Sequence, residues 1–526
     1  MGRPPYIEER VTAKVPLLLL ALAPLGKGFA GGFETIVESD LTRDVGALAD
    51  PALEGRDTPS RGLARAAEII AERFGAAGLV AAYPSTAGAE PDTGFRRAFH
   101  RRLPEPDPAG CALEMEPAGA RALELGRDFV PVTGFSGDAE GPVVFAGYGI
   151  RSKTERYDDL AGLELDKKIV VVVEGEPRHD RKFDGPELSR AASLWDKLDA
   201  LAESGAAGVL AVRRAAVAGA APAKEADAIS FRATWADWNG VAADPPARRK
   251  LPVLEVSLRC AGEILGEDVE ALVGRIDRSA RPVRAAKSDR RVRMRSRTRE
   301  TSVAIDNLVG MLPGSDAALS AEFVVVGAHY DHVGIDPRGR IACGADDNAS
   351  GVAGMLEIAE ALAQAGPRRS VLFCAFAGEE DGLLGSQALC GDLPVPKEKL
   401  VAMVNMDMIG RGDAGELAVL GIVQNPGLEK VVARARKLRP SGVREVVLRE
   451  GEELFERSDH FSFHKIGVPA LFFFEGLPID KNKDYHTWRD TVDKLDTKKM
   501  LNTTRFVYNA TWILTDDDER PPPPRD

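Results

Sequence analysis

Short apolar runs alternate with helical stretches from about Ser302 to Leu514, and this alternation constrains the fold more than any other feature of the chain. Each apolar run is rich in β-branched or aromatic residues and is bounded by turn-forming residues, as buried strands are. Such alternation predicts an α/β fold with a mostly parallel mixed sheet that is flanked by helices on both faces. The expected strands lie within EFVVVGAHY, RRSVLFCAFAGEE, LVAMVNMDMIG and GVPALFFFEG, and a final helix is expected from about Asp496 to Leu514.

The chain has 526 residues, which is too long for one ordinary core, so we expect two domains with extensions. Short strand patterns such as GPVVFAGYGI and KKIVVVVEGEP begin near Gly141 and predict an inserted, β-rich α/β module. A helix over Ser60–Leu79 is expected to pack on the main domain. The expected divisions are a leader (1–30), the N-terminal part of the main domain (31–140), the inserted domain (141–285), the remainder of the main domain (286–515) and a disordered tail (516–526).

The N-terminal segment KVPLLLLALAPLGKGFAGG has the features of a secretory leader. Lys14 precedes an apolar run from Val15 to Leu25, and the small residue Ala30 follows it. The run is too short to span a bilayer. The sequence therefore predicts a protein without a membrane span that is secreted or held in the periplasm or cell envelope.

Charge argues against a general nucleic-acid binder, because 81 acidic residues outnumber 69 basic ones and give a formal net charge of −12. One basic segment stands out, in which Arg291, Arg293 and Arg295 alternate with other residues. A period of two places such residues on one face of a strand. An anion-binding strip and a solvated strand face both fit this pattern, and we favour the solvated face.

Cysteine usage limits the kinds of metal site that the chain can form. The five cysteines are scattered and form no CxxC pair, which argues against a disulfide framework and against a cysteine zinc site. Five of the seven histidines, in contrast, lie between His329 and His486. Any bound metal is therefore expected to be held by histidine and carboxylate side chains.

Ionisable side chains follow the expected strands at the point where each strand ends. Because ligands bind at the carboxyl ends of strands in such sheets, we expect these side chains to converge. Acidic residues at a helix start also serve as caps, which would account for Asp346 or Asp347 taken alone. Convergence of the whole set instead favours a site for two divalent metals. The residues concerned are His329, Asp331, Asp346, Asp347, Glu379, Glu380, Asp407 and His486.

The motifs GAHYDHVG, GADDNASG, FAGEEDGLLGS, NMDMIG, SDHFSF and DYHTWRDT resemble those of the co-catalytic di-zinc aminopeptidases of the zinc-exopeptidase clan. The resemblance spans about Ser302–Thr515, with the Ser60–Leu79 helix as the first part of the same domain. The region 141–285 resembles the protease-associated domain that is often inserted in this family.

The resemblance implies a role for each site residue. His329 and Asp407 would hold one zinc ion, Glu380 and His486 would hold the other, and Asp347 would bridge them; cobalt or manganese could replace zinc. Glu379 would be the general base and Asp331 would orient His329. The resemblance also implies a cis peptide bond between Asp347 and Asn348, whereas His332 is expected to be a structural or pocket-wall residue.

The activity implied by the resemblance is hydrolysis of N-terminal peptide bonds in peptides or proteins, with a metal-bridging hydroxide as the nucleophile. A carboxypeptidase, a cyclase or a deacylase on the same scaffold is the alternative, because Arg411 or Arg457 could bind a substrate carboxylate. A non-catalytic, receptor-like relative is disfavoured, since all five ligand positions and the base are present.

Overall fold

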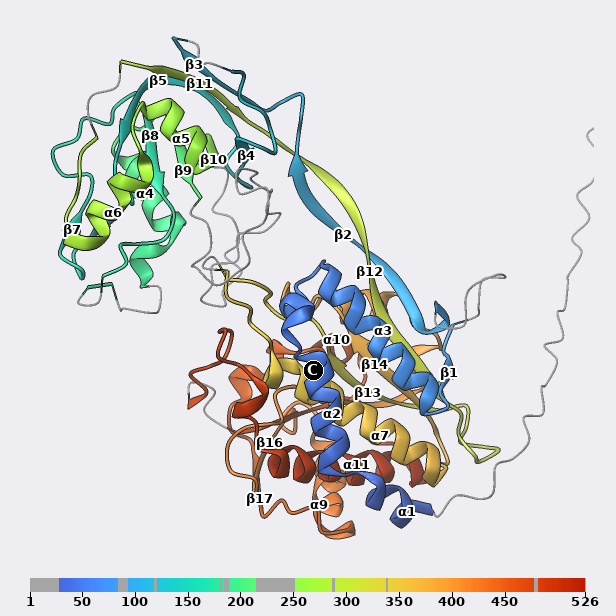
Figure 1. The fold of residues 1–526 in the computed structure, drawn as a ribbon. Coiled ribbons are helices and arrows are strands. Elements are labelled where there is room, and N and C mark those ends of the chain that lie inside the picture. Colours follow the sequence, from blue (N-terminus) through green and yellow to red (C-terminus); the bar gives the residue numbers. More distant parts are fainter. Residues whose placement is uncertain are drawn as a thin grey trace, which may run out of the picture.

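The computed structural model describes residues 28–83, 93–117, 121–179, 182–183, 189–213, 251–285, 289–336, 339–476 and 481–525. Residues 1–27 of the expected leader lie outside these ranges. The described chain forms two main bodies, each built on its own sheet, and a long two-stranded ribbon runs between them (Figure 1).

The larger body contains the predicted mixed sheet, which is parallel at its centre, while four of its eight strand pairings among the described residues are antiparallel. Its centre consists of parallel neighbours in the order β14-β13-β15-β18, and the flanking strands β12 and β16 run antiparallel to β14 and β18. The strands are β1 (Val80–Ala81), β2 (Arg96–Pro106), β12 (Thr298–Leu312), β13 (Phe323–His329), β14 (Ser370–Phe376), β15 (Leu400–Met406), β16 (Glu416–Leu420), β17 (Glu445–Leu448) and β18 (Ala470–Phe474).

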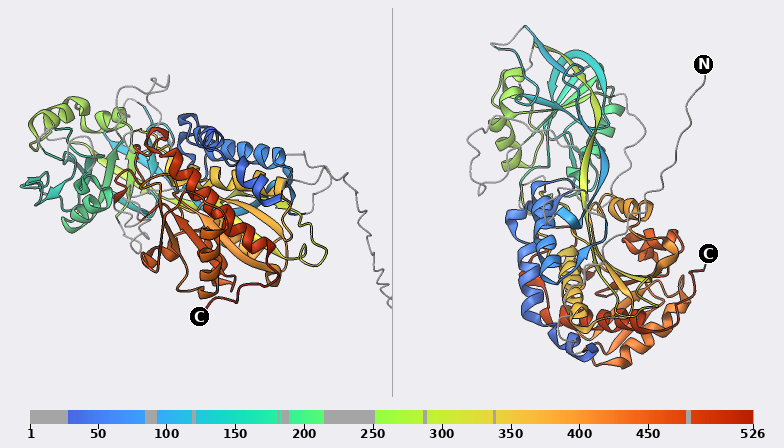
Figure 2. Two further views of the ribbon diagram at one scale, coloured as in Figure 1. Left: turned by 90° about the horizontal axis from the view of Figure 1, so that it is seen from below. Right: turned by 90° about the vertical axis from the view of Figure 1, so that its right-hand side faces the viewer.

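Helices cover both faces of this sheet, which confirms the predicted layering (Figures 1 and 2). The larger apolar core lies between one face and most of the helices, and a smaller core lies on the opposite face beneath α8 and α10. The helices are α1 (Gly28–Thr35), α2 (Glu38–Leu48), α3 (Arg61–Ala76), α7 (Gly351–Ala365), α8 (Leu384–Gly391), α9 (Glu429–Leu438), α10 (His460–Lys465) and α11 (Thr497–Asp516).

Local sequence signals explain where the main helices begin and end. The Ser60 side chain accepts a hydrogen bond from the Leu63 N–H at the start of α3, and Asp496 caps α11 in the same way. Gly366 ends α7 in the left-handed conformation, with a φ of 72°, that glycine adopts without strain. Helix α3 therefore lies within the expected range Ser60–Leu79, and α11 extends two residues beyond its predicted end at Leu514.

The smaller body is built on a second sheet with the strand order β3-β11-β5-β8-β9-β10-β4. Its helices are α4 (Leu194–Glu203), α5 (Leu258–Leu265) and α6 (Val269–Ser279). The sheet extends beyond both ends of the expected insert, 141–285, because β3, β4 and β11 lie outside that range. The strands are β3 (Ala112–Glu116), β4 (Phe129–Pro131), β5 (Gly137–Phe145), β8 (Ile169–Val173), β9 (Gly208–Val212), β10 (Val253–Val256) and β11 (Arg291–Ser296).

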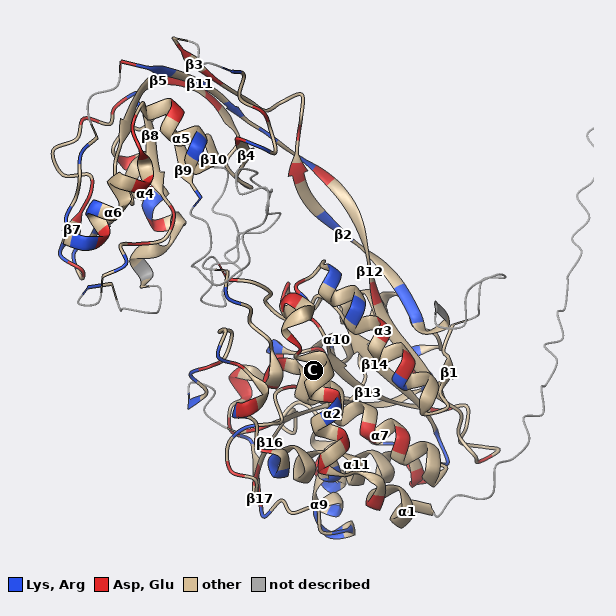
Figure 3. Cartoon of the chain, in the orientation of Figure 1, with Lys and Arg blue, Asp and Glu red and all other residues tan. Residues whose placement is uncertain are grey.

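The arginine-rich segment forms β11, whose residues alternate strictly between exposed and buried. Its outward-facing Arg291 and Arg293 pair with Glu140 on the neighbouring β5. Basic and acidic segments also lie side by side around β3, β5 and β11 in Figure 3. The pattern is that of a solvated strand face with cross-strand ion pairs, which was the favoured interpretation.

The C-terminal tail differs from the expectation of disorder. Residues 517–525 form no helix or strand, but they lie against the larger body. Asp517 pairs with Arg434, and the Arg520 guanidinium donates to the carbonyl groups of Glu398 and Leu400. These charge-assisted contacts hold a segment whose composition alone predicted no structure.

Among the described residues, no helix combines the length and apolar character that crossing a membrane requires.

Candidate metal centre

The predicted site residues meet at the carboxyl-terminal edge of the large sheet. The strands β13, β14 and β15 are parallel neighbours, so the residues that follow them emerge side by side. His329 ends β13, Glu379 and Glu380 follow β14, and Asp407 follows β15. Asp347 lies in the short, irregular π-helical segment η4 (Ala345–Ser350) that leads into α7, and His486 lies in the loop after β18.

Two clusters form around the carboxylate of Asp347. In the first, His329 Nε2 lies 3.2 Å from Asp407 Oδ1 and 3.4 Å from Asp347 Oδ1. In the second, His486 Nε2 lies 2.9 Å from Glu380 Oε2 and 3.0 Å from Asp347 Oδ2. The two oxygens of Asp347 thus face different clusters, as a carboxylate that bridges two metals must.

The spacing of these atoms is compatible with metal ligation. Two ligand atoms about 2.0–2.2 Å from one tetrahedral metal lie about 3.3–3.6 Å from each other. The two contacts of the first cluster, 3.2 and 3.4 Å, are close to that separation, whereas those of the second cluster, 2.9 and 3.0 Å, are shorter. Although His486 Nε2 is near two carboxylates, neither contact has hydrogen-bond geometry, and both buried ring nitrogens of His486 have no hydrogen-bond partner. A divalent cation would satisfy these groups.

The electrostatics of the site also favour bound positive charge. Burial alone would lower the pKa of His486, but the carboxylates of Glu380 and Asp347 together outweigh it and raise the pKa to about 11. Burial likewise opposes protonation of His329, but Asp407 and Glu379, with a hydrogen bond to Asp331, together raise the pKa of that imidazole well above its usual value. A divalent cation at each cluster would supply the positive charge that these carboxylates attract.

Burial raises the pKa of the Glu379 carboxyl well above its usual value, with His329 opposing the rise and Glu380 adding to it. Burial acts in the same direction on Glu380, but His486 and His332 together outweigh it and lower the pKa of that carboxyl well below its usual value. The two adjacent glutamates therefore differ in their affinity for a proton. Such divergence is typical of an acid–base residue beside a ligand.

Asp331 lies beside His329, and its carboxylate also contacts the loop after β14 that carries Glu379 and Glu380, here called the glutamate loop. Its two carboxylate oxygens accept the backbone N–H groups of Glu379 at 3.2 Å and of Glu380 at 3.3 Å. His329 Nδ1 is 3.6 Å from Asp331 Oδ1 and 3.3 Å from the Asp331 carbonyl oxygen. Asp331 thus reaches the imidazole mainly through its backbone, while its side chain holds the loop that carries the predicted base.

Hydrogen bonds to two aspartate carboxylates, those of Asp490 and Asp346, fix the segment that carries Asp347. The carboxylate of Asp490 accepts the backbone N–H groups of Asp346 and Asp347, and Asp346 Oδ1 accepts the N–H of Gly410. Asp346 therefore supports this segment and belongs to neither ligand cluster. The peptide bond between Asp347 and Asn348 is cis, as the family resemblance implied.

Three further residues belong to the site, although the sequence assigned them no ligand or catalytic role. His332 was expected in the pocket wall, but its Nδ1 lies 3.0 Å from Glu380 Oε1 and 3.7 Å from Asp347 Oδ2, within the second cluster. Tyr485 stacks on His486 with ring centroids 3.8 Å apart, and Arg457 donates to its hydroxyl at 3.2 Å. Of the three, Tyr485 could have been found from the sequence, because it directly precedes the predicted ligand His486.

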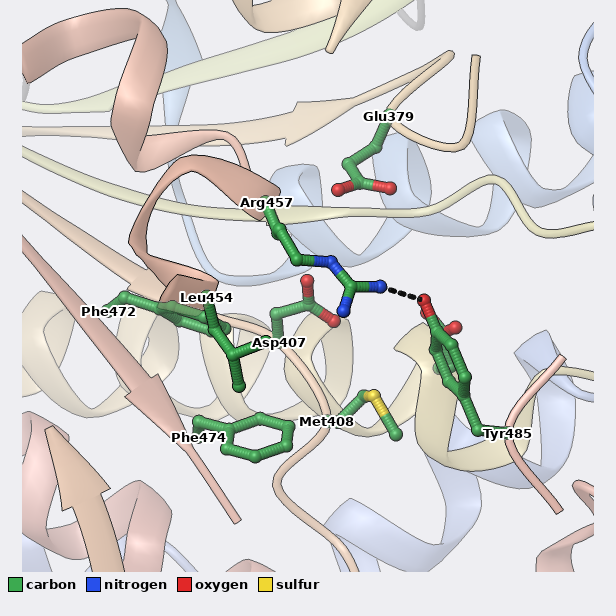
Figure 4. A pocket seen from close by; sticks show the side chains of 9 residues that line it. Glu379, Asp407, Met408, Leu454, Arg457, Phe472, Phe474 and Tyr485 are labelled. Atoms are coloured by element: carbon green, nitrogen blue, oxygen red, sulfur yellow. Dashed lines mark hydrogen bonds between the residues drawn. The ribbon is translucent and has the colours of Figure 1, made fainter. Parts of the chain in front are cut away.

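A pocket opens directly beside the two clusters (Figure 4). Glu379, Asp407, Arg457 and the Tyr485 hydroxyl occupy its polar side. Asp347 also lines the pocket. The opposite side is apolar. It is lined by Met408, Leu454, Phe472 and Phe474.

The carboxyl edge of the large sheet thus presents two histidine–carboxylate clusters that share one aspartate, an arrangement that could hold two metal ions. Residues 307–511 match the model of Peptidase family M28. The match includes every predicted ligand and the predicted base.

Similar curated proteins carry aminopeptidase names. A probable leucine aminopeptidase of Arthroderma otae is 35% identical over 211 residues, which are 39% of this chain and 56% of the relative. Leucine aminopeptidase 1 of Blastomyces gilchristii is 30% identical over 219 residues, which are 40% of this chain and 56% of the relative. The chain thus spans about half the length of the curated relatives it matches.

A solved structure supports the fold over nearly the whole chain. The zinc aminopeptidase BSAP from Bacillus subtilis aligns with a TM-score of 0.52 at 19% identity and covers 92% of this chain and 96% of its own. The likeness includes the smaller body as well as the family domain.

Proposed function

We propose that the protein is a zinc-dependent aminopeptidase that binds two metal ions and removes apolar N-terminal residues from peptides. The observation that carries this proposal is the shared carboxylate of Asp347, whose two oxygens face two separate clusters of ligand atoms. The names of the curated relatives support the same reaction class.

The bound metals would polarise the scissile carbonyl and make water easier to deprotonate. The remaining steps belong to side chains of this chain. Glu379 lines the pocket next to both clusters, where it can take a proton from the attacking water and deliver it to the leaving amine. Its raised pKa suits a group that must hold that proton for part of the cycle.

The pocket walls suggest how a substrate is oriented. The apolar side formed by Leu454, Phe472 and Phe474 suits an aliphatic or aromatic side chain at the substrate's N-terminus. The Tyr485 hydroxyl faces the reacting end of the pocket, where it can donate a hydrogen bond to negative charge that develops on the carbonyl oxygen. The carboxylates at the same end favour a protonated α-amine.

One observation supports the alternative of a carboxypeptidase. Arg457 lines the pocket and could bind a substrate carboxylate. Arg411, the other basic candidate, already donates to Asn482 and Asp484 at 2.9 Å each. The carboxypeptidase alternative thus depends on Arg457. In this structure its guanidinium donates a hydrogen bond to the Tyr485 hydroxyl.

A substrate panel separates these functions. Leucine amide, N-acetyl-leucine amide and N-blocked peptides with a free C-terminus are incubated with zinc-loaded protein, with and without chelator. An aminopeptidase releases leucine only from the substrate with a free amine, and chelator abolishes the release. Equal cleavage of the acetylated amide would point to a deacylase or amidase, and C-terminal trimming of blocked peptides would point to the carboxypeptidase.

We also propose that the smaller body is a protease-associated domain and that the protein acts outside the cytoplasm. The first proposal rests on the insertion of that body between parts of the larger one, and the second on the apolar run after Lys14. N-terminal sequencing of the mature protein from the envelope or medium tests the export proposal. Full-length protein found only in the cytoplasm would contradict it.

A further inference from the structure

The ribbon between the two bodies passes close to the metal centre. Strand β2 pairs with β12 over its full length of 11 residues, from Arg96 opposite Leu308 to Pro106 opposite Thr298. At one end β12 joins the large sheet, and at the other the chain continues into β3 and β11 of the second sheet (Figures 1 and 2). Side chains on this ribbon can therefore contact both bodies.

Arg101, near the middle of β2, reaches from the ribbon into the loop that carries Glu379. Its guanidinium forms a two-pronged contact with the carboxylate of Asp381, in which Nη2 lies 2.7 Å from Oδ1 and Nη1 contacts Oδ2. The side chains of Arg101 and Asp381 are only 12% and 24% exposed, so water screens the pair weakly. Asp381 directly follows Glu379 and Glu380 in the chain.

A second contact of Arg101 closes a ring of interactions around the same loop. Nη1 also donates to the Thr58 carbonyl at 2.5 Å, and the Thr58 hydroxyl donates to Asp331 Oδ2 at 3.2 Å. Asp331 in turn accepts the backbone N–H groups of Glu379 and Glu380. The loop is therefore held from its backbone by Asp331 and from its side chain by Arg101.

We propose that Arg101 is a positioning residue that fixes the Glu379–Glu380 loop, so that the ribbon leading to the second sheet sets the placement of the base and of one ligand. The inference rests on the proposed function, because it treats Glu379 and Glu380 as working residues of the site. Arg101 touches neither substrate nor metal and acts through Asp381 and Thr58.

The ribbon offers a matched control for this role. Arg97, on the same strand, also ties the ribbon to the larger body, through Asp392, with Nε at 2.6 Å from Oδ2. Asp392 follows α8 and does not belong to the glutamate loop. Loss of the Arg97 contact weakens the docking of the ribbon without releasing the loop.

The experiment compares wild type with Arg101→Ala, Arg101→Lys, Asp381→Asn, the Arg101→Ala/Asp381→Asn double variant and Arg97→Ala. For each zinc-loaded protein, kcat and KM for leucine amide, zinc affinity by chelator competition and the melting temperature are measured. Arg101→Ala should lower kcat by about 10- to 100-fold with KM nearly unchanged, because a displaced base loses its geometry. Its zinc affinity should fall about 10-fold through Glu380.

The other variants separate positioning from a general loss of stability. Arg101→Lys should recover part of the lost kcat, Arg97→Ala should keep the wild-type kcat, and the double variant should resemble Arg101→Ala because both changes remove the same contact. Three results would overturn the proposal. They are a wild-type kcat in Arg101→Ala, an equal loss of kcat in Arg97→Ala, and a loss of kcat in the double variant that equals the product of the two single losses. If wild type itself cleaves no peptide, the proposed function fails, while the zinc affinities still test the role of Arg101.

Discussion

The carboxylate of Asp490 accepts hydrogen bonds from the backbone that carries Asp347. The variant Asp490→Asn tests how much these hydrogen bonds contribute to metal binding. The side chain is buried and receives the Asp346 N–H at 3.0 and 3.1 Å and the Asp347 N–H at 3.0 Å. Asparagine keeps one acceptor oxygen but turns an N–H group toward one of the two backbone donors. Loss of a hydrogen bond to a charged acceptor costs about 1.5–3 kcal/mol.

At about 1.4 kcal/mol for each factor of ten, this cost predicts a zinc affinity about 10- to 100-fold weaker in Asp490→Asn. The assay is competition with a chromophoric chelator, accompanied by thermal unfolding to confirm that the variant folds. Asp493→Asn is the control, since that exposed side chain accepts a hydrogen bond from nearby Thr491. Wild-type zinc affinity in a folded Asp490→Asn, or an equal loss in Asp493→Asn, would refute the reasoning.

Three further changes test other parts of the account. Glu379→Gln should keep its zinc but lose about 10²- to 10⁴-fold in kcat, and near-wild-type turnover would remove Glu379 as the base. Leu454→Ala enlarges the apolar side of the pocket and should lower kcat/KM for leucyl substrates about 10-fold more than for alanyl ones, a ratio that competition between the two amides measures directly. Burial raises the pKa of Glu357 on α7 to about 8, so the folded protein retains a proton that the unfolded chain releases, and stability should fall as pH rises from about 4.5 to about 8. Glu357→Gln should flatten this dependence in urea unfolding at about pH 5 and about pH 8; parallel slopes in both proteins would contradict it.

The fold of the larger body could be predicted because its signals are local. The runs around Val324, Leu372 and Val404 are long enough and apolar enough to be buried strands, and Gly366 marks where the helix between the first two ends. The extent of the second sheet could not be predicted in the same way. Its strand β11 pairs with β3, which lies far away in the sequence, and neither strand carries a mark of its partner.

The same distinction applies to the site. His329, Glu380 and Asp407 follow buried strands, so the topology of a parallel sheet brings them together. His332 lies in irregular chain after β13, where no periodicity indicates which way a side chain points. Arg101 contacts the site only because the ribbon packs against the glutamate loop, a tertiary contact that the local pattern of β2 does not contain.

The central claim is that one carboxylate, that of Asp347, joins two metal positions on which peptide cleavage depends. The most direct test is zinc titration of chelator-stripped protein, with bound zinc and release of leucine from leucine amide followed together, for wild type and for Asp347→Ala. The two clusters predict two zinc ions per chain in wild type, activity that returns with zinc, and loss of both ions and of activity in Asp347→Ala. Cleavage by stripped wild type in excess chelator, or tight binding of two zinc ions by Asp347→Ala, would contradict the account.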